Sequence, residues 1–431
     1  MKQSSVALLC AWGLVAIVAT QALGDGVVVD GVGATSGGRG GTNIANADNG
    51  AVLLDNPAGI VNIDGCGLFE LGLDGLLTDL DYSDPENSTN AKFRPMALPH
   101  FSYIRKSCDG DWAAGLGVYA PAGFGAQWSM NQAVFGPDHH GYKSIGALVK
   151  ILPGIAYRLT DELSIGATLG VGVSHAELEG PFFLQNPSPS PPLVGGIPTR
   201  LDLQATGAAP TWSVGMQYQL SERTTLGLAY TDETRFRLNG NARTSVLGLA
   251  PVPVESKFDA DVDLVWPRSL GLGVKHDLCA CQRLSVDVVW FDWSHAFDHI
   301  DMKLTDSSNP AFGPLTPIRD SFPLDWDDSV SLRIGYELFS TPCDVWRLGY
   351  VYNSRNIPSS TLTPYIPAIL EHSFTVGYGK RWGNWTFDTA YQFSFSPERH
   401  VDGSDLVGGD FDNSEVKAQA HWLLLSASYR W

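Results

Sequence analysis

The sequence has few basic residues, and it has no long apolar run after residue 24. Of its 431 residues, 28 are Lys or Arg and 46 are Asp or Glu, which gives a formal net charge of −18. That balance disfavours nucleic acid as a partner, because binding to phosphates needs concentrated positive charge. After residue 24 no stretch has the roughly 20 consecutive apolar residues of a membrane helix, although 44% of the chain is hydrophobic. The apolar residues must therefore be spread over strands or a soluble core.

The first 24 residues have the pattern of a secretory signal peptide. Lys2 precedes an apolar run over residues 6–18, and a small-residue cleavage pattern follows at residues 22–24. The run is shorter than the roughly 20 residues that a membrane span requires. We therefore expect residues 1–24 to be removed after export, with Asp25 as the first residue of the mature chain.

Alternation of apolar and polar residues is the dominant local pattern. Neighbouring residues of a strand point to opposite faces, so alternation fits a wall with lipid on one side and a lumen on the other. In bacterial outer-membrane barrels, the last strand usually has an outward-facing apolar side and ends in an aromatic residue. In the last strand the apolar face is formed by Leu423, Leu425, Ala427, Tyr429 and Trp431, and similar sets occur at residues 163–173, 212–218, 226–230, 284–290, 330–336 and 374–378.

The connections between these strands alternate in length. Short turns are expected at residues 106–111, 160–162, 221–223, 277–282, 340–345 and 383–384, and long segments at 127–143, 181–206, 235–258, 305–326, 353–371 and 396–415. Short periplasmic turns and long extracellular loops characterise up-and-down outer-membrane barrels. We therefore predict an all-β fold, a transmembrane antiparallel up-and-down barrel of about fourteen strands over residues 65–431.

Residues 25–64 do not follow the strand pattern. A glycine-rich run over residues 31–41 is followed by a segment with turn-forming residues and modest apolar content. One interpretation is a disordered leader to the barrel, since glycine-rich segments often lack fixed structure. The alternative, which we favour, is an N-terminal hatch folded inside the lumen, where small residues let backbones approach closely.

Six blocks of sequence resemble the FadL family of outer-membrane transporters for long-chain fatty acids and aromatic hydrocarbons. They occur in the family's order and span nearly the whole mature chain, at residues 37–59, 115–128, 153–167, 266–270, 290–294 and 363–367. The first block resembles the family's hatch, with Gly41 and the Asn-Pro-Ala signature at Asn56, Pro57 and Ala58. The Pro-rich run within residues 181–198 departs from the family's apolar capture loop.

The resemblance implies passive uptake of hydrophobic small molecules by a monomer embedded among outer-membrane lipid and lipopolysaccharide. Ligand would be captured by extracellular loops, pass to a lumenal pocket and leave sideways through a kinked third strand. The residues give this exit independent support, because a proline has no N–H for the ladder and glycines weaken a strand. We therefore expect broken pairing and a lateral opening at Pro121, Ala122, Gly123, Phe124 and Gly125. The alternative function is a general solute porin or an adhesin-like barrel.

Five cysteines follow the leader, and each is expected at the periplasmic end of a strand: Cys66, Cys108, Cys279, Cys281 and Cys343. Disulfides form in an oxidising periplasm, so Cys66 could pair with Cys108, and Cys343 with Cys279 or Cys281. Free thiols in the turns are the alternative, and the odd count leaves at least one sulfur unpaired.

No catalytic motif stands out. The sequence has no Gly-x-Ser-x-Gly elbow, and we expect no enzyme activity. The densest Asp/His group, around Asp292 and His295, alternates faces on a strand and is interpreted as a solvated strand end. We therefore expect neither a metal site nor a cofactor.

Overall fold

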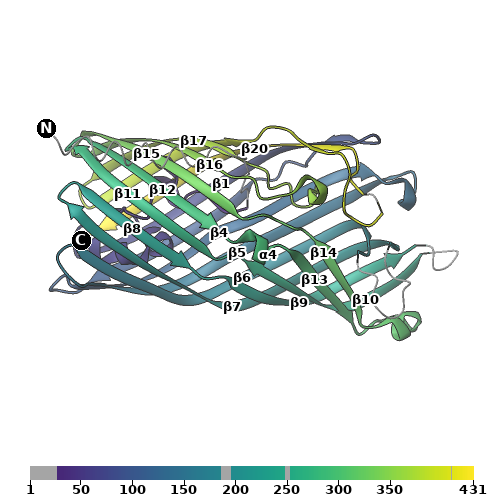
Figure 1. Ribbon diagram of the computed structural model, residues 1–431. Coiled ribbons are helices and arrows are strands. Elements are labelled where there is room, and N and C mark those ends of the chain that lie inside the picture. The colour runs from purple at the N-terminus through teal and green to yellow at the C-terminus, as the bar shows by residue number, and fades with distance from the viewer. Residues whose placement is uncertain (1–26, 186–195, 248–252, 409) are drawn as a thin grey trace.

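The computed structural model describes residues 27–185, 196–247, 253–408 and 410–431. They form one antiparallel sheet whose last long strand, β20 (Ser414–Arg430), pairs with the first, β1 (Gly67–Ser83), from Leu68 opposite Arg430 to Ser83 opposite Glu415. The sheet is thus closed into a barrel of fourteen strands (Figure 1), which confirms the predicted fold class. The expected signal peptide lies outside the described residues.

Ten of the fourteen crossings are single strands. Besides β1 and β20 these are β3 (Met96–Lys106), β4 (Trp112–Asn131), β5 (His139–Arg158), β6 (Leu163–Phe183), β7 (Pro198–Ser221), β16 (Asp344–Asn353), β17 (His372–Trp382) and β18 (Trp385–Phe395). Two short strands, β2 (Ser88–Asn90) and β19 (Arg399–Val401), extend the ladder at the end opposite the short turns.

Four neighbouring crossings are each built from two segments. They are β8 (Thr224–Thr231) with β9 (Thr234–Val246), β10 (Val254–Trp266) with β11 (Ser269–Cys279), β12 (Gln282–Phe291) with β13 (His299–Thr305), and β14 (Ile318–Pro323) with β15 (Ser329–Thr341). The interruptions lie at one level of the wall, because Ser269 is opposite both Thr231 and Phe291, and Phe291 is also opposite Ser329. Pro267 lacks an N–H for the ladder, and helix α4 (Trp293–Ala296) is inserted in the third crossing.

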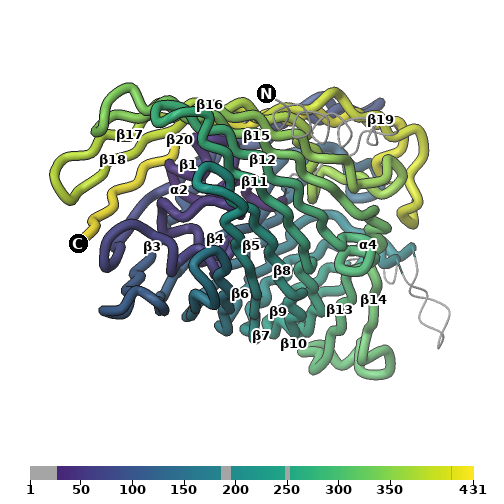
Figure 2. Tube along the Cα trace, turned by 60° about the vertical axis from the view of Figure 1, so that its left-hand side comes forward, coloured from purple at the N-terminus to yellow at the C-terminus, as the bar shows by residue number. Residues whose placement is uncertain are grey.

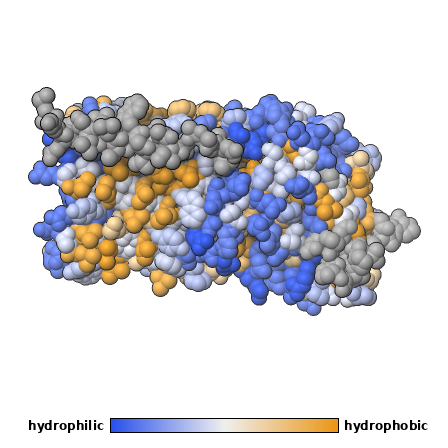
Figure 3. All heavy atoms as spheres, viewed as in Figure 1, coloured by the Kyte–Doolittle hydropathy of each residue, from blue (hydrophilic) through white to orange (hydrophobic). Residues whose placement is uncertain are grey.

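The outer surface is divided along the barrel axis. Exposed large apolar side chains gather at the end with the short turns and include Leu169, Trp212, Leu272, Leu348 and Leu425. In Figure 3 this half of the visible face is apolar, whereas the half over β9, β10 and β13 is mainly hydrophilic. An outward apolar band is the lipid-facing surface of an outer-membrane barrel. The hydrophilic half therefore projects beyond the membrane.

Several expected long loops are shorter than predicted. Strand β6 continues to Phe183 and β7 begins at Pro198, so residues 181–183 and 198–206 are strand and not loop. Likewise β9 and β10 occupy most of residues 235–258. The sequence pattern failed here because the projecting wall faces water and carries polar side chains on its outer face, where an apolar set was expected. Of the Pro-rich run, residues 186–195 lie outside the described residues.

The N-terminal segment, residues 27–64, lies within the ring of strands (Figure 2). It contains helix α2 (Gly33–Gly38), helix α3 (Val52–Asp55) and the 3-10 helix η1 (Pro57–Asn62). Short 3-10 helices η2 (Ala133–Phe135), η3 (Pro310–Leu315) and η4 (Ser359–Thr361) occur in the long connections. No helix in the described ranges has the length and apolar character needed to cross a membrane.

Glycines on the inner wall allow the N-terminal segment to lie against it. A Cβ atom at Gly215 would be 1.9 Å from Asn56 Oδ1, and one at Gly166 would be 2.5 Å from the carbonyl carbon of Pro57. Any larger residue at these positions would displace the Asn56-Pro57 turn. The glycine on the second face of the alternating strands is therefore explained by this close approach.

Candidate functional site

The ladder between β3 and β4 is broken next to Pro121. Strand β3 pairs with β4 only as far as Val118, although β4 continues to Asn131 along β5. The pairing of β4 with β5 also shifts register between Tyr119 and Ala122. Broken pairing and a lateral opening were expected at residues 121–125; β3 does not pair with these residues, whereas residues 122–125 remain paired with β5, and the opening stays a prediction.

The N-terminal segment occupies part of the edge that β3 leaves free. Val29 N donates to Pro121 O at 2.9 Å, and Gly123 N donates to Val27 O at 2.9 Å. Val28 lies opposite Ala122 in an isolated antiparallel bridge. The start of the described chain thus takes the place of a neighbouring strand over three residues of β4, and the backbone groups of the kink remain satisfied.

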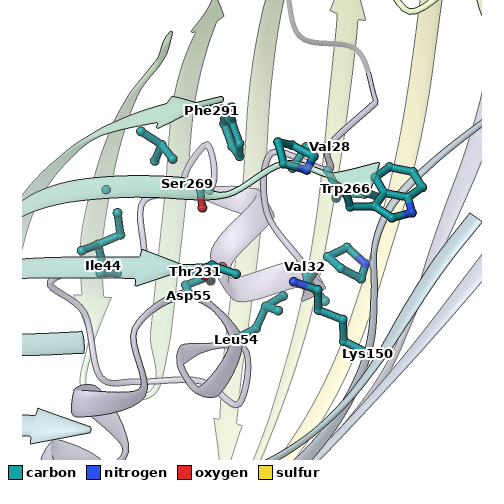
Figure 4. Close-up of a pocket in the computed structure, with 18 of the residues that line it drawn as sticks. Val28, Val32, Ile44, Leu54, Asp55, Lys150, Thr231, Trp266, Ser269 and Phe291 are labelled. Carbon is teal, nitrogen blue, oxygen red and sulfur yellow. The ribbon is translucent and has the colours of Figure 1, made fainter. Parts of the chain in front are cut away.

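A cavity of about 120 Å³ lies beside this kink (Figure 4). We call it the central cavity. It borders Pro121 and Ala122 on one side and the belt of strand interruptions, at Pro267, on the other. Its lining is mainly apolar and includes Val28, Val32, Leu148, Trp266 and Phe291. By volume it is comparable to an engineered apolar cavity of roughly 150 Å³ that binds benzene.

Two cations, Lys150 and Arg333, and one carboxylate, Asp55, line the central cavity. Lys150, on β5, is 7% exposed, and its side chain reaches between those of Val32 and Leu54 (Figure 4). In the part of the chain that the structure describes, its ammonium has neither a hydrogen-bond acceptor nor a carboxylate within ion-pair distance. Buried ammonium groups are costly without a partner. Lys150 could not be singled out from the sequence, because a lysine on a strand is normally a solvated side chain.

A second apolar cavity, of about 100 Å³, lies in the projecting half of the barrel. We call it the outer cavity. Phe182 and Phe322 stack in its wall with ring centroids 5.8 Å apart. Tyr365 and Ile366 complete the lining from the connection between β16 and β17. Tyr365 is fixed by its hydroxyl, which donates to Pro181 O at 2.7 Å. The sequence block at residues 363–367 is therefore placed at this cavity.

Charged groups fasten the N-terminal segment to the wall. The Arg39 guanidinium is fully buried and lies 2.7 Å from Asp48 and 3.4 Å from Glu337 of β15. Burial by itself opposes both charges, but the Arg39 guanidinium holds the pKa of Asp48 well below its usual range. On the neighbouring strand β12, Asp287 accepts from the backbone N–H groups of Asn43 and Ile44 at 2.7 and 3.0 Å.

The four predicted hatch residues lie within this fastened segment. Asn56 caps η1 by accepting from Ala58 N at 3.2 Å, and its amide donates to Ile44 O and to Met216 O of β7. Pro57 is the first residue of η1, against Gly166. Gly41 has a φ of +74°, and a Cβ there would be 1.8 Å from Asp30 O, so only glycine fits.

Asp55 makes the docking of this segment sensitive to pH. Burial raises the pKa of Asp55 to about 6, although Asn43 donates to its carboxylate at 2.6 Å. In the docked segment Asp55 therefore keeps its proton up to about pH 6, whereas in a free segment it would lose the proton near its ordinary pKa of 3.8. Because the docked form binds more protons between these two values, docking should weaken as pH rises from about 4 to 6. We expect Asp55→Asn to reduce this pH dependence of amide hydrogen exchange in residues 27–63, after correction for intrinsic rates. An unchanged dependence in that window would assign it to other carboxyl groups.

All five mature cysteines lie at the end with the short turns, as the strand count predicts. Cys66 precedes β1, Cys108 lies between β3 and β4, and Cys343 between β15 and β16. The structure has all five as free thiols, so the proposed pairings of Cys66 with Cys108 and of Cys343 with Cys279 or Cys281 remain predictions. Cys279 and Cys281 flank one turn, with their sulfur atoms 2.6 Å apart.

The fold brings together three possible metal ligands that the sequence pattern did not indicate. Glu398, His400 and Glu415 place ligand atoms within 4.8 Å of one another at the outer end of the barrel. However, Lys417 Nζ lies 2.9 Å from Glu398 and 3.0 Å from Glu415. A lysine ammonium already neutralises this group, so it is best described as an exposed ion-pair network.

Comparison with known proteins agrees with this geometry. A family model described as "Outer membrane protein transport protein (OMPP1/FadL/TodX)" matches residues 15–431. No curated protein sequence gives a significant match. Among solved structures, a Pseudomonas aeruginosa FadL homologue is similar with a TM-score of 0.76 and 17% identity, over 94% of this chain and 99% of that one.

Two toluene transporters have similar structures. For TodX of Pseudomonas putida the TM-score is 0.76 at 20% identity, covering 96% of this chain and 100% of that one. For TbuX of Ralstonia pickettii it is 0.72 at 20% identity, covering 93% and 99%. At such low identity, these likenesses concern the fold.

Proposed function

Because this chain belongs to the OMPP1/FadL/TodX family of outer-membrane transport proteins, we propose that it takes up hydrophobic compounds by passive diffusion and releases them sideways into the membrane. Ligand enters at the projecting end, passes the outer cavity and then the central cavity, and leaves between β3 and β4. Lateral exit avoids rehydrating the ligand, which would cost about 0.8 kcal/mol per CH₂ group.

The observation that carries this proposal is the coincidence of the central cavity with the unpaired part of β4. Pro121 and Ala122 line the cavity, and they lie in the stretch of β4 beyond Val118 that β3 does not pair with. A hydrophobic ligand in the cavity is therefore separated from lipid by the Val27–Val29 strand substitute and not by a continuous ladder. Breaking these two backbone hydrogen bonds would open the wall, which is a smaller change than parting two paired strands.

The outer cavity supports a capture step before this exit. Its lining combines aromatic and aliphatic side chains from β4, β5, β6, β7, β10, β13 and β14 with Tyr365 and Ile366. These surfaces are mostly apolar and lie above the level of the membrane, where ligand arrives. An apolar cavity binds such ligands without requiring a specific polar partner.

Lys150 gives the proposed substrate a chemical class. An ammonium without a partner in an apolar cavity is stabilised by an anionic group that arrives with the ligand. We therefore propose that the protein prefers amphipathic carboxylic acids, such as fatty acids, over neutral aromatic hydrocarbons. The carboxylate would lie at Lys150 and the apolar part against Leu148, Trp266 and Phe291. A chain longer than a few methylenes extends from the cavity towards the opening.

Lys150→Met should separate the two substrate classes. The substitution keeps the length and apolar stem of the side chain and removes its charge. We expect the affinity for a medium-chain fatty acid to fall by about 10- to 100-fold, because a charge-assisted hydrogen bond contributes about 1.5–3 kcal/mol. Binding of toluene should remain unchanged or improve. Both affinities would be measured by titration of the purified barrel with fluorescent or radiolabelled ligand.

Lys143→Met is the matched control, since that lysine also lies on β5 but pairs with Glu177 outside the central cavity. If fatty-acid affinity is the same in all three proteins, Lys150 does not select the substrate, while uptake of hydrophobic compounds in general still stands. If no variant, including the natural protein, binds either class, the uptake proposal itself fails.

The proposed surroundings follow from the division of the outer surface. The apolar half contacts membrane lipid and the hydrophilic half contacts the polar part of lipopolysaccharide. A closed barrel has no free sheet edge along its membrane part, and we therefore expect a monomer. We also expect no enzyme activity, since members of this family transport their ligands and do not react with them.

A further inference from the structure

Two thiols share one short turn at the periplasmic rim. Strand β11 ends at Cys279, β12 begins at Gln282, and these two residues are paired across the turn. Cys281 is exposed and Cys279 is partly exposed. The turn is therefore accessible from the periplasm, and its backbone is held by the strand pair on either side.

The two sulfur atoms are in direct contact. Cys279 Sγ and Cys281 Sγ lie 2.6 Å apart, and the backbone N–H of Cys281 also points to Cys279 Sγ at 3.4 Å. The backbone N–H donates to Cys279 Sγ and not to Cys281 Sγ, which favours the thiolate at Cys279. Donation to Cys279 raises the pKa of the Cys281 thiol. The pair therefore consists of a nucleophilic sulfur and a second thiol within reach of it.

The surroundings favour redox chemistry over metal binding. Within the described residues, no third His, Cys, Asp or Glu places a ligand atom within 4.8 Å of both sulfur atoms. A structural zinc site needs four ligands, and the turn offers two. The other three mature cysteines lie in separate segments of the rim and are exposed.

We propose that Cys279 and Cys281 form a redox-active dithiol that exchanges with disulfides in the periplasm. The Cys279 thiolate attacks one sulfur of an incoming disulfide, of glutathione or of a protein, and the other sulfur leaves as a thiol after taking up a proton. Cys281 then loses its proton and attacks Cys279 Sγ, which releases the second thiol. The turn loses two electrons and two protons to form a Cys279–Cys281 disulfide, and one external disulfide becomes two thiols.

This site is independent of the proposed transport route. Neither cysteine lines the central or the outer cavity. An exposed disulfide closed over a single intervening residue belongs to the labile class that exchanges readily, unlike the buried structural disulfides of secreted proteins. The rim of the barrel would thus carry a reversible modification without a change in the wall.

The test uses the full chain in detergent with Cys10→Ser, Cys66→Ser, Cys108→Ser and Cys343→Ser, so that only the pair remains. The protein is equilibrated with glutathione at increasing ratios of disulfide to thiol, alkylated and weighed by mass spectrometry. We expect one transition from a doubly alkylated chain to an unalkylated chain lighter by two hydrogen atoms. A dominant singly modified or glutathione-bound species would overturn the proposal.

Two single variants in that background identify the nucleophile. With Cys281→Ser, Cys279 should form a mixed disulfide with glutathione about tenfold faster than Cys281 does with Cys279→Ser. Equal rates would overturn the assigned roles. In the natural protein, peptide mapping should find the Cys279–Cys281 link, and a link to Cys343 would refute it. Retention of Zn²⁺ by the reduced pair in place of oxidation would identify a metal site instead.

Discussion

Deletion of residues 25–64 is expected to raise the single-channel conductance severalfold while the barrel remains folded. Residues 27–64 of this segment fill the lumen between α2, which lies against β17, β18 and β20, and η1, which lies against β5, β6 and β7. The wall is closed by its own ladder from β1 to β20, so apart from the kink at residues 121–123 its pairing does not depend on the segment. Without it, water and ions can follow the lumen. Planar-bilayer recordings would measure the conductance, and circular dichroism the strand content.

Arg39→Met provides a milder version of the same test. It removes one charge from a buried network in which Arg283 still lies 3.5 Å from both Asp48 and Glu337, so the cost should be below the roughly 3–5 kcal/mol of leaving a buried charge without any partner. We expect intermittent openings in place of a permanent one. Arg235→Met is the control, because Arg235 is exposed and pairs with Glu233 outside the lumen.

Two outcomes would contradict the hatch. Unchanged conductance after the deletion would mean that other parts of the chain close the lumen. A natural protein that already conducts ions as freely as the deleted form would favour the alternative, a general solute porin or an adhesin-like barrel. Loss of strand content would point instead to a role of the segment in assembly, which Arg39→Met would then test in an intact chain.

Gly125→Trp is expected to reduce uptake of hydrophobic compounds to about one tenth or less, equivalent to a barrier higher by about 1.4 kcal/mol. A Cβ atom at Gly125 meets only ordinary contacts, at 3.5 Å from Ser144 O and 3.9 Å from Met96 Sδ. An indole there would fill the space between β4 and the start of β3. Gly123 is less suitable, because a Cβ there would be 2.9 Å from the backbone oxygen of Gly146 and would disturb the ladder.

Uptake would be followed with a radiolabelled fatty acid in cells that depend on this barrel. Gly125→Ala is the control, since a methyl group fits and leaves the space open. Ligand binding by the purified Gly125→Trp protein should persist, because Gly125 lines neither cavity. Normal uptake in the Trp variant, with the protein folded and present in the membrane, would exclude an exit between β3 and β4.

Strand number and orientation could be predicted from sequence because they depend on local chemistry. Alternation at residues 163–173 predicts one apolar face whatever the rest of the chain does, and short turns set which strands are neighbours. Pro121 could also be interpreted locally, because a residue without an N–H disturbs any ladder. The positions of the cysteines followed from the same strand count.

The prediction failed where the surroundings of a residue differ from what its neighbours in sequence suggest. Residues 198–206 were expected in a loop, since polar residues on the outer face of a projecting wall look like a loop. The belt of interruptions near Pro267 and α4 arises from four crossings aligned side by side, which no single segment indicates.

The sequence by itself determined that this protein is a membrane barrel with a glycine-rich N-terminal segment, because periodicity, turn residues and backbone permissiveness are properties of each segment alone. Only the tertiary structure decided what surrounds each polar side chain. Lys150 is unremarkable in its strand, and it becomes a candidate anion site because β5, the N-terminal segment and Trp266 enclose it with Asp55 in the lining but with no described carboxylate within ion-pair distance. Arg39 gains its partners from Asp48 and from Glu337, 298 residues away. Such pairings depend on closure of the barrel, which brings distant segments together and excludes the water that would otherwise solvate them.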